Sequence, residues 1–167
     1  MDRVFIKLFK AIAMALLMAT TTLLVAQSPT PSVNAVFRDG FAAYQEGNYQ
    51  LALTNYNNAI NMAPDKAYLY YNRGITYRAM NNAAMAIADL QKSIDLRPTA
   101  EAYSQLGAIK YEKGDNAGAK ADFENARTLN QDMGKMNFCL GMIYYRGEQY
   151  EDALKCLTDY TATIKNQ

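Results

Sequence analysis

The sequence predicts an all-α protein built from four repeated helix pairs. Three observations predict this fold class: glycines at regular steps, alanines at the same steps, and helical spacing of the apolar residues around them. The glycines, which recur at almost equal steps along the chain, are Gly40, Gly74, Gly107 and Gly141. The alanines, which follow the same steps, are Ala52, Ala86, Ala119 and Ala153. Two markers that stay in phase over four copies indicate a true internal repeat.

Each copy is expected to form two short helices joined by a turn. The apolar residues that show helical spacing rather than alternation near the end of the chain are Ala153, Leu154, Leu157 and Tyr160. The turn residues within the four copies are Gly47–Asn48, Asn81–Asn82, Gly114–Asp115 and Gly147. Glycine takes the left-handed conformation that ends a helix, and Asn or Asp caps the next one. Pro64 and Pro98 mark joins between copies, because proline does not fit inside a helix.

The four copies span about residues 33–66, 67–99, 100–133 and 134–167. The single missing residue falls between Pro98 and Gly107, where a loop tolerates a deletion. The glycine and alanine of each copy, such as Gly40 and Ala52, are expected to face each other and let the two helices approach closely. One helix pair cannot bury its apolar side alone, so stacked pairs are expected to share a continuous core, as in an α-solenoid.

These residues resemble the tetratricopeptide repeat family, which pairs helices in repeating units of about 34 residues. The positions that match the family pattern are Leu106–Gly107, Leu140–Gly141, Tyr77, Tyr144, Ala52, Ala86, Ala119, Ala153, Tyr56, Phe123, Pro64 and Pro98. The resemblance covers residues 33–167 and implies a right-handed α-solenoid. The chain departs from the pattern at three kinds of position. The family's early aromatic position is occupied by Val36, Tyr70, Tyr103 and Asn137. The leucine that usually precedes the glycine is replaced by Asp39 and Arg73. The third proline is replaced by Gln131.

Composition argues against catalysis, metal binding and a cofactor. The chain has no His, which removes the commonest general base and metal ligand. Its two cysteines, Cys139 and Cys156, are not spaced as a zinc site, and no nucleotide-binding or hydrolase motif is present. We therefore expect a protein that is not an enzyme.

The segment over residues 1–26 differs from the rest of the chain. Its basic residues precede an uncharged stretch over residues 11–26, which is shorter than the apolar run of about 20 residues that a spanning helix needs. This pattern is typical of a signal peptide cleaved after Ala26, followed by a linker over residues 27–32. Such a protein acts outside the cytoplasm, in a periplasm, in a lumen or as a secreted protein. The alternative is that residues 1–26 remain as a membrane anchor.

Charge gives no support to nucleic-acid binding. The whole chain has 17 basic and 16 acidic residues. Residues 1–26 hold three of the basic and one of the acidic residues, so the remainder has 14 and 15. The part after residue 26 therefore lacks the basic excess on which nucleic-acid binding depends.

The resemblance implies that the first helices of the copies line a groove that holds a partner's peptide or helix. The twelve residues it places there are Phe37, Phe41, Tyr44, Tyr68, Tyr71, Ile75, Arg78, Tyr111, Phe138, Met142, Tyr145 and Arg146. We interpret this aromatic row as a site for an apolar or aromatic partner segment, because clustered aromatic residues on a surface often mark interfaces. The alternative is that the rings only pack against neighbouring helices.

The chaperone-binding members of the family hold a C-terminal carboxylate with Lys, Asn, Asn, Lys and Arg. The corresponding residues here are Phe37, Phe41, Asn72, Glu101 and Gln105. Only Asn72 matches, and Glu101 has the wrong charge, so the sequence excludes that sub-type. Asn72 is better interpreted as a solvated or locally hydrogen-bonded amide.

Two further expectations concern the last copy. Its second helix is expected to leave Leu154, Leu157, Tyr160 or Ile164 partly uncovered, and a homodimer through this helix is one consequence. Cys139 and Cys156 lie on opposite helices of the copy, so they are candidates for a disulfide. Buried free thiols are the favoured interpretation, because free cysteine is commonly buried.

Overall fold

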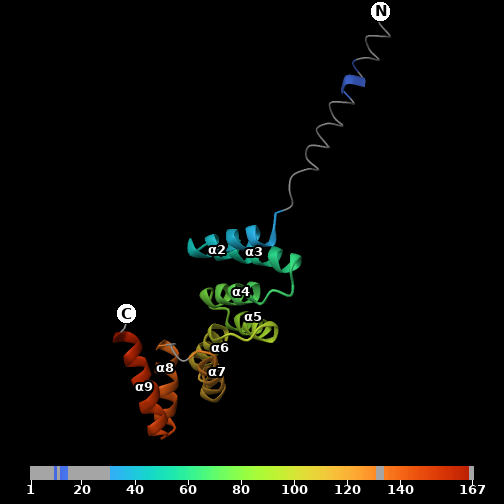
Figure 1. Ribbon diagram of the computed structural model, residues 1–167. Coiled ribbons are helices and arrows are strands. Elements are labelled where there is room, and N and C mark those ends of the chain that lie inside the picture. Colours follow the sequence, from blue (N-terminus) through green and yellow to red (C-terminus); the bar gives the residue numbers. More distant parts are fainter. Residues whose placement is uncertain (1–9, 11, 15–30, 131–133, 166–167) are drawn as a thin grey trace, which may run out of the picture. The chain divides into compact units, whose positions relative to one another are not determined.

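The structure, a computed structural model, describes residues 10, 12–14, 31–130 and 134–165 of the chain. Residues 1–32 and 33–167 form separate units. Within the described part of the second unit, eight helices follow one another as pairs joined by short turns (Figure 1). The four pairs are α2 (Val33–Gln45) with α3 (Tyr49–Met62), α4 (Ala67–Ala79) with α5 (Ala83–Leu96), α6 (Ala100–Glu112) with α7 (Asn116–Leu129), and α8 (Gly134–Arg146) with α9 (Tyr150–Lys165). The all-α prediction of four helix pairs is confirmed.

The turns within the first three pairs have the predicted chemistry. The side chains of Asn48, Asn82 and Asp115 each accept a hydrogen bond from the backbone N–H three residues later, at 3.3, 3.3 and 2.9 Å. The residue just before each cap has a left-handed backbone, with φ of +76° at Gly47, +57° at Asn81 and +81° at Gly114. Local side-chain capping thus begins the second helix of these pairs.

The prediction for the fourth turn is wrong in its register. Glu148, not Gly147, takes the left-handed conformation, with φ of +61°. Glu148 stands one full repeat after Gly114, so it occupies the same position in its copy. The left-handed conformation was predicted at Gly147 because glycine favours it, but the repeat length determines which residue adopts this backbone.

The small residues lie where the helices of a pair meet. Ala52, Ala86 and Ala119 are fully buried, and Ala153 is nearly so. A Cβ atom added at Gly107 would come within 2.9 Å of the Phe123 ring and 3.2 Å of the carbonyl oxygen of Ala119. The side chain closest to the glycine is thus the one four residues after the alanine. The corresponding closest residues in the other pairs are Tyr56, Leu90 and Leu157.

The hydrophobic core continues from each pair into the next. Ile60 of α3 packs with Leu69 of α4, and Leu90 of α5 packs with Leu106 of α6. The largest cluster joins α6, α7, α8 and α9 and includes Phe123. Consecutive pairs therefore bury their apolar sides against each other, as expected of an α-solenoid.

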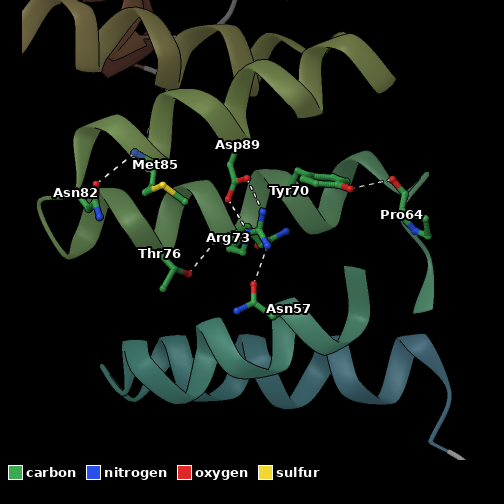
Figure 2. A network of polar contacts seen from close by, with 9 residues as sticks. Asn57, Pro64, Tyr70, Arg73, Thr76, Asn82, Met85 and Asp89 are labelled. Atoms are coloured by element: carbon green, nitrogen blue, oxygen red, sulfur yellow. Dashed lines mark hydrogen bonds and ion pairs between the residues drawn. The ribbon is translucent and has the colours of Figure 1, made fainter. Parts of the chain in front are cut away.

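A polar cluster built around the buried carboxylate of Asp89 ties the first two pairs together (Figure 2). The guanidinium of Arg73 on α4 donates from Nε and Nη2 to the two carboxylate oxygens of Asp89 on α5, both at 2.7 Å. Its third nitrogen, Nη1, donates to Oδ1 of Asn57 on α3, also at 2.7 Å. Arg73, which replaces the family's usual leucine, therefore connects three helices from two pairs.

Residues 1–26, predicted to be a signal peptide or membrane anchor, and the linker over residues 27–32 fall mostly outside the described residues. Lys10 and residues 12–14 are helical. In the part of the chain that the structure describes, no helix has the length and apolar character needed to cross a bilayer.

Candidate functional site

The candidate site is the first-helix face, which we define as the twelve predicted groove residues on α2, α4, α6 and α8. The structure divides the eight aromatic residues and Ile75 of this face into two groups. Phe41, Tyr68, Phe138 and Tyr145 have exposed rings, with Phe41 44% and Tyr145 57% exposed. Phe37, Tyr44, Tyr71, Ile75 and Tyr111 are half-buried and pack against the core clusters. The exposed rings are therefore the members available to a partner.

At the first two pairs the face is a cluster of aromatic rings. The ring of Phe37 lies edge-on to that of Tyr68, with centroids 4.9 Å apart, and 6.3 Å from that of Phe41. The Tyr68 hydroxyl also donates to Asn34 Oδ1 at 3.4 Å. These contacts join α2 to α4, so the predicted row is continuous across the first junction.

Arg78 is already engaged within the protein. Its guanidinium on α4 donates to the side chains of Gln105 and Glu112, both on α6. A partner carboxylate would have to displace these acceptors, so Arg78 acts first as a tie between the second and third pairs. This pairing also gives a role to Glu112, which lies next to the face residue Tyr111 in the chain.

The fourth pair presents exposed rings of its own. Phe138 lies 5.2 Å from Tyr160, and Tyr145 lies 5.8 Å from Tyr150, measured between ring centroids. Met142 beside them is half-buried, and Arg146 at the end of α8 is exposed. Aromatic surface is thus present at both ends of the first-helix face.

A pocket of about 490 Å³ lies at the junction of the second and third pairs. We call it the junction pocket, and it is lined by Asp65, Lys66, Ala67, Tyr68, Tyr71, Ser93, Leu96, Arg97, Thr99 and Glu101. Burial raises the pKa of the Tyr71 phenol, and the negative charge of Glu101 raises it further, so this hydroxyl stays protonated at neutral pH. Two predicted residues, Tyr68 and Tyr71, therefore belong to a concave site.

Sequence reasoning missed most of the junction pocket. Ser93 and Leu96 come from the end of α5 and Arg97 directly follows it, whereas only first helices were expected to line the groove. A signal for these residues was present in the sequence, because Pro98 ends α5 close to the start of α6 and so brings its last turn to the junction.

The two remaining expectations concern single residues. The Asn72 amide donates to the backbone oxygen of Tyr68 at 2.7 Å, which is the locally bonded state expected for it. Cys139 and Cys156 carry free thiols in the structure, and the Cys156 sulfur accepts a hydrogen bond from Arg127 Nη1 at 3.3 Å. Burial raises the pKa of both thiols, which disfavours the reactive thiolate.

The described side chains include no cluster of three or more Cys, Asp or Glu residues that could hold a metal ion. The first-helix face offers aromatic rings, half-buried apolar side chains and two arginines, of which Arg78 is held by Gln105 and Glu112.

Sequence comparison matches the chain to three tetratricopeptide repeat profiles. One described as TPR repeat covers residues 40–81, and two described as tetratricopeptide repeat cover residues 67–99 and 105–162. A similar curated protein is the Hsp70-Hsp90 organizing protein of Triticum aestivum, 35% identical over 92 residues. That match covers 54% of this chain and 16% of the relative, so the chain spans a small part of that protein's length.

Two solved structures show the same fold. A crystal structure of MamA matches with a TM-score of 0.74 and 20% identity, covering 99% of this chain and 96% of that one. The first TPR of Spaghetti (RPAP3), bound to the HSP90 peptide SRMEEVD, matches with a TM-score of 0.65 and 23% identity. The second match covers 68% of this chain and 91% of the other.

Proposed function

The chain belongs to the tetratricopeptide repeat family, and on this premise we propose that it is a non-catalytic scaffold that binds a segment of a partner protein on its first-helix face. The observation that carries the proposal is the set of exposed rings, Phe41, Tyr68, Phe138 and Tyr145, on that face. Aromatic residues bury a large area at a low cost in side-chain entropy and are enriched in interfaces. The HSP90 peptide bound to the first TPR of Spaghetti supports a peptide ligand for this fold.

The partner segment that the face favours is apolar or aromatic rather than acidic. The HSP90 peptide bound to Spaghetti, SRMEEVD, is rich in acidic residues. In this chain the basic residues of a carboxylate clamp are absent, and Arg78 is held by Gln105 and Glu112. An acidic segment would therefore meet few free cations on the first-helix face, while rings are available at both ends.

Binding to a partner is tested by capture with the full chain as bait. Phe41→Ala combined with Tyr145→Ala is expected to lower capture at least tenfold, because both rings are exposed and neither belongs to a buried core cluster. The matched control is Leu51→Ala with Met85→Ala, which removes two similarly exposed apolar side chains from the second helices α3 and α5. Equal capture by the two double variants would refute binding on the first-helix face.

We further propose that the protein assists the assembly of a complex outside the cytoplasm. The support is the leader pattern of residues 1–26, and the alternative is a tetratricopeptide repeat module tethered to the membrane by the same residues. Intact mass of the protein from its native cells, together with membrane fractionation, distinguishes the two. A mass that lacks residues 1–26 supports export with cleavage, and a full-length mass in the membrane fraction supports the tether.

Self-association through α9 is a second candidate function. It is favoured by the exposure of Leu154 and Ile164, which are 69% and 53% exposed, as expected from the sequence. Leu154 occupies the repeat position that Lys120 and Ile87 hold in the two preceding copies, and both of those residues lie near the following pair. A monomeric mass in light scattering at high concentration would rule out this candidate, and a dimer that Leu154→Lys dissociates would establish it.

A further inference from the structure

The residues that line the junction pocket are suited to contact an aromatic ring. Tyr68 and Tyr71 of α4 supply aromatic surface, and Leu96 of α5 and Ala67 supply aliphatic surface. Its volume of about 490 Å³ lies in the range of small-ligand sites, which take ligands larger than one amino-acid side chain. Aromatic pairs gain attraction beyond the area they bury, so a third ring fits beside these two better than an aliphatic group does.

The charges around the junction pocket balance one another. Lys66 and Asp65 form an ion pair at 2.9 Å, which leaves the pocket with one further cation, Arg97, and one further anion, Glu101. The pocket is therefore lined by equal numbers of acidic and basic residues. An ion of either sign would gain attraction from one rim group and repulsion from the other, so this arrangement favours an uncharged ligand.

The junction pocket is also continuous with the aromatic cluster of the first pair. Tyr68, which lines the pocket, packs its ring against Phe37 and bonds to Asn34 on α2. A segment that lies across the exposed Phe41 and Tyr68 rings therefore contacts a residue that lines the pocket. One of its side chains can enter while its neighbours stay on the face.

We propose that the junction pocket is the site where the partner segment inserts one uncharged aromatic side chain. This inference rests on the proposed function, and it adds the chemistry of the residue that the partner must carry. Recognition of a single ring by Tyr68, Tyr71 and Leu96 would fix the register of the segment on the first-helix face.

Tryptophan probes test the proposal directly, because the chain contains no Trp and its own emission comes from Tyr. The full chain is titrated with three indoles of different charge: neutral N-acetyltryptophanamide, cationic tryptamine and anionic N-acetyltryptophan. The neutral probe is expected to shift its emission to shorter wavelength with saturation, and to bind at least threefold more tightly than either charged probe. A charged probe that binds more tightly, or no saturable shift, would overturn the proposal.

Two kinds of variant locate the probe. Ala67→Phe places a ring in the junction pocket and should abolish binding, whereas the matched control Ala79→Phe, at the exposed far end of the same helix, should not change it. Tyr71→Phe keeps the ring and should bind as the parent does, while Tyr71→Ala should weaken binding at least threefold. Equal effects of Ala67→Phe and Ala79→Phe would contradict the assignment.

A measurement on the unmodified chain removes any dependence on how the variants fold. N-acetyltryptophanamide should cause ring-current shifts of the Ala67 and Leu96 methyl signals, and shifts confined to other methyls would place the probe elsewhere. The capture experiment separates this inference from the proposed function. If Phe41→Ala with Tyr145→Ala abolishes capture while Ala67→Phe leaves it intact, the face binds a partner and the pocket inference is wrong.

Discussion

The second and third helix pairs place an aspartate at the same position, three residues after the shared alanine, and neutralise it differently. Asp89 receives two bonds from the forked guanidinium of Arg73, the residue before Gly74. In the third pair Leu106 stands before Gly107, and Asp122 is paired instead with Lys110 Nζ at 2.7 Å, from one turn later on α6. The second and third pairs thus share a buried aspartate at one repeat position, but the cation that pairs with it comes from a different position of the first helix.

The two pairings differ in completeness. Arginine occupies both oxygens of Asp89 and still reaches Asn57, whereas lysine offers a single point charge to Asp122. Burial raises the pKa of the Asp122 carboxyl above its ordinary value of 3.8, although the adjacent Lys110 lowers it. Arg73 thus bonds to both carboxylate oxygens of Asp89, whereas Lys110 pairs with one oxygen of Asp122.

The largest expected effect is at the second pair. Asp89→Ala leaves the mostly buried Arg73 guanidinium without its partner, and breaking a buried ion pair in this way costs about 3 kcal/mol. Urea unfolding followed by circular dichroism measures this loss. Asp95→Ala on the same helix is the control, because Asp95 is exposed and its carboxylate accepts a bond from the exposed Gln91. A loss no greater than that of the control would show that the pair of Arg73 and Asp89 contributes nothing to stability.

A smaller loss of stability is expected at the buried alanine that the second and third pairs share. Ala86→Leu should lower the free energy of unfolding by about 2 kcal/mol, because Ala86 is fully buried and the added atoms have no space. Ala119→Leu in the third pair should cost a similar amount, measured by thermal melting. Ala84→Leu, at an exposed position of α5, serves as the control. An unchanged melting temperature in Ala86→Leu would refute the close approach of the helices.

In the third pair, the main expected effect is a change in the pKa of the Asp122 carboxyl. Because the folded-state pKa of Asp122 lies above the unfolded value, the stability it contributes is complete below about pH 3.8 and is lost as the pH rises through the folded-state pKa. Lys110→Met should raise that pKa further and lower neutral-pH stability by about 1 kcal/mol, since the carboxyl can take up a proton instead. Titration of the Asp122 carboxyl by carbon NMR measures the shift. A lowered pKa in this variant would contradict the role of Lys110.

The smallest expected effect is a gain of stability at the fourth turn. Glu148→Gly removes the left-handed strain of a residue with a Cβ, partly offset by the entropy of glycine in the unfolded chain, for a net gain of about 0.5 kcal/mol. Asn81→Gly, at the same position of the second pair, should change little because asparagine tolerates this backbone. Chemical denaturation of both variants tests the difference, and a destabilised Glu148→Gly would show that the glutamate side chain makes a compensating contact.

The fold could be predicted from the sequence because its signals are local and periodic. The steps from Gly40 to Gly141 fixed the helix pairs, and Asn48, Asn82 and Asp115 began the second helices as capping chemistry requires. Glu148 was missed because a nearby glycine is a stronger local signal than the repeat length, although the repeat length decides the backbone.

The site was only partly predictable, because it depends on contacts between residues far apart in the chain. The exposed rings Phe41 and Tyr145 follow from the repeat register. Two other features do not: the engagement of Arg78 by Glu112, one repeat later in the chain, and the contribution of Leu96 to the junction pocket. Both depend on how one helix pair packs against the next, and no short sequence pattern predicts that packing.

The bond from Arg73 to Asn57 has a consequence for how the molecule opens. Repeats in such arrays contact only their neighbours, so each pair can fray separately unless the seam between two pairs is costly to part. Separating the first pair from the second would remove one acceptor of the Arg73 guanidinium. Separating the second pair from the third would remove two acceptors of the Arg78 guanidinium. Amide hydrogens on the two sides of these two junctions should therefore exchange together, while those of α9, where Leu154 and Ile164 are exposed, should exchange first.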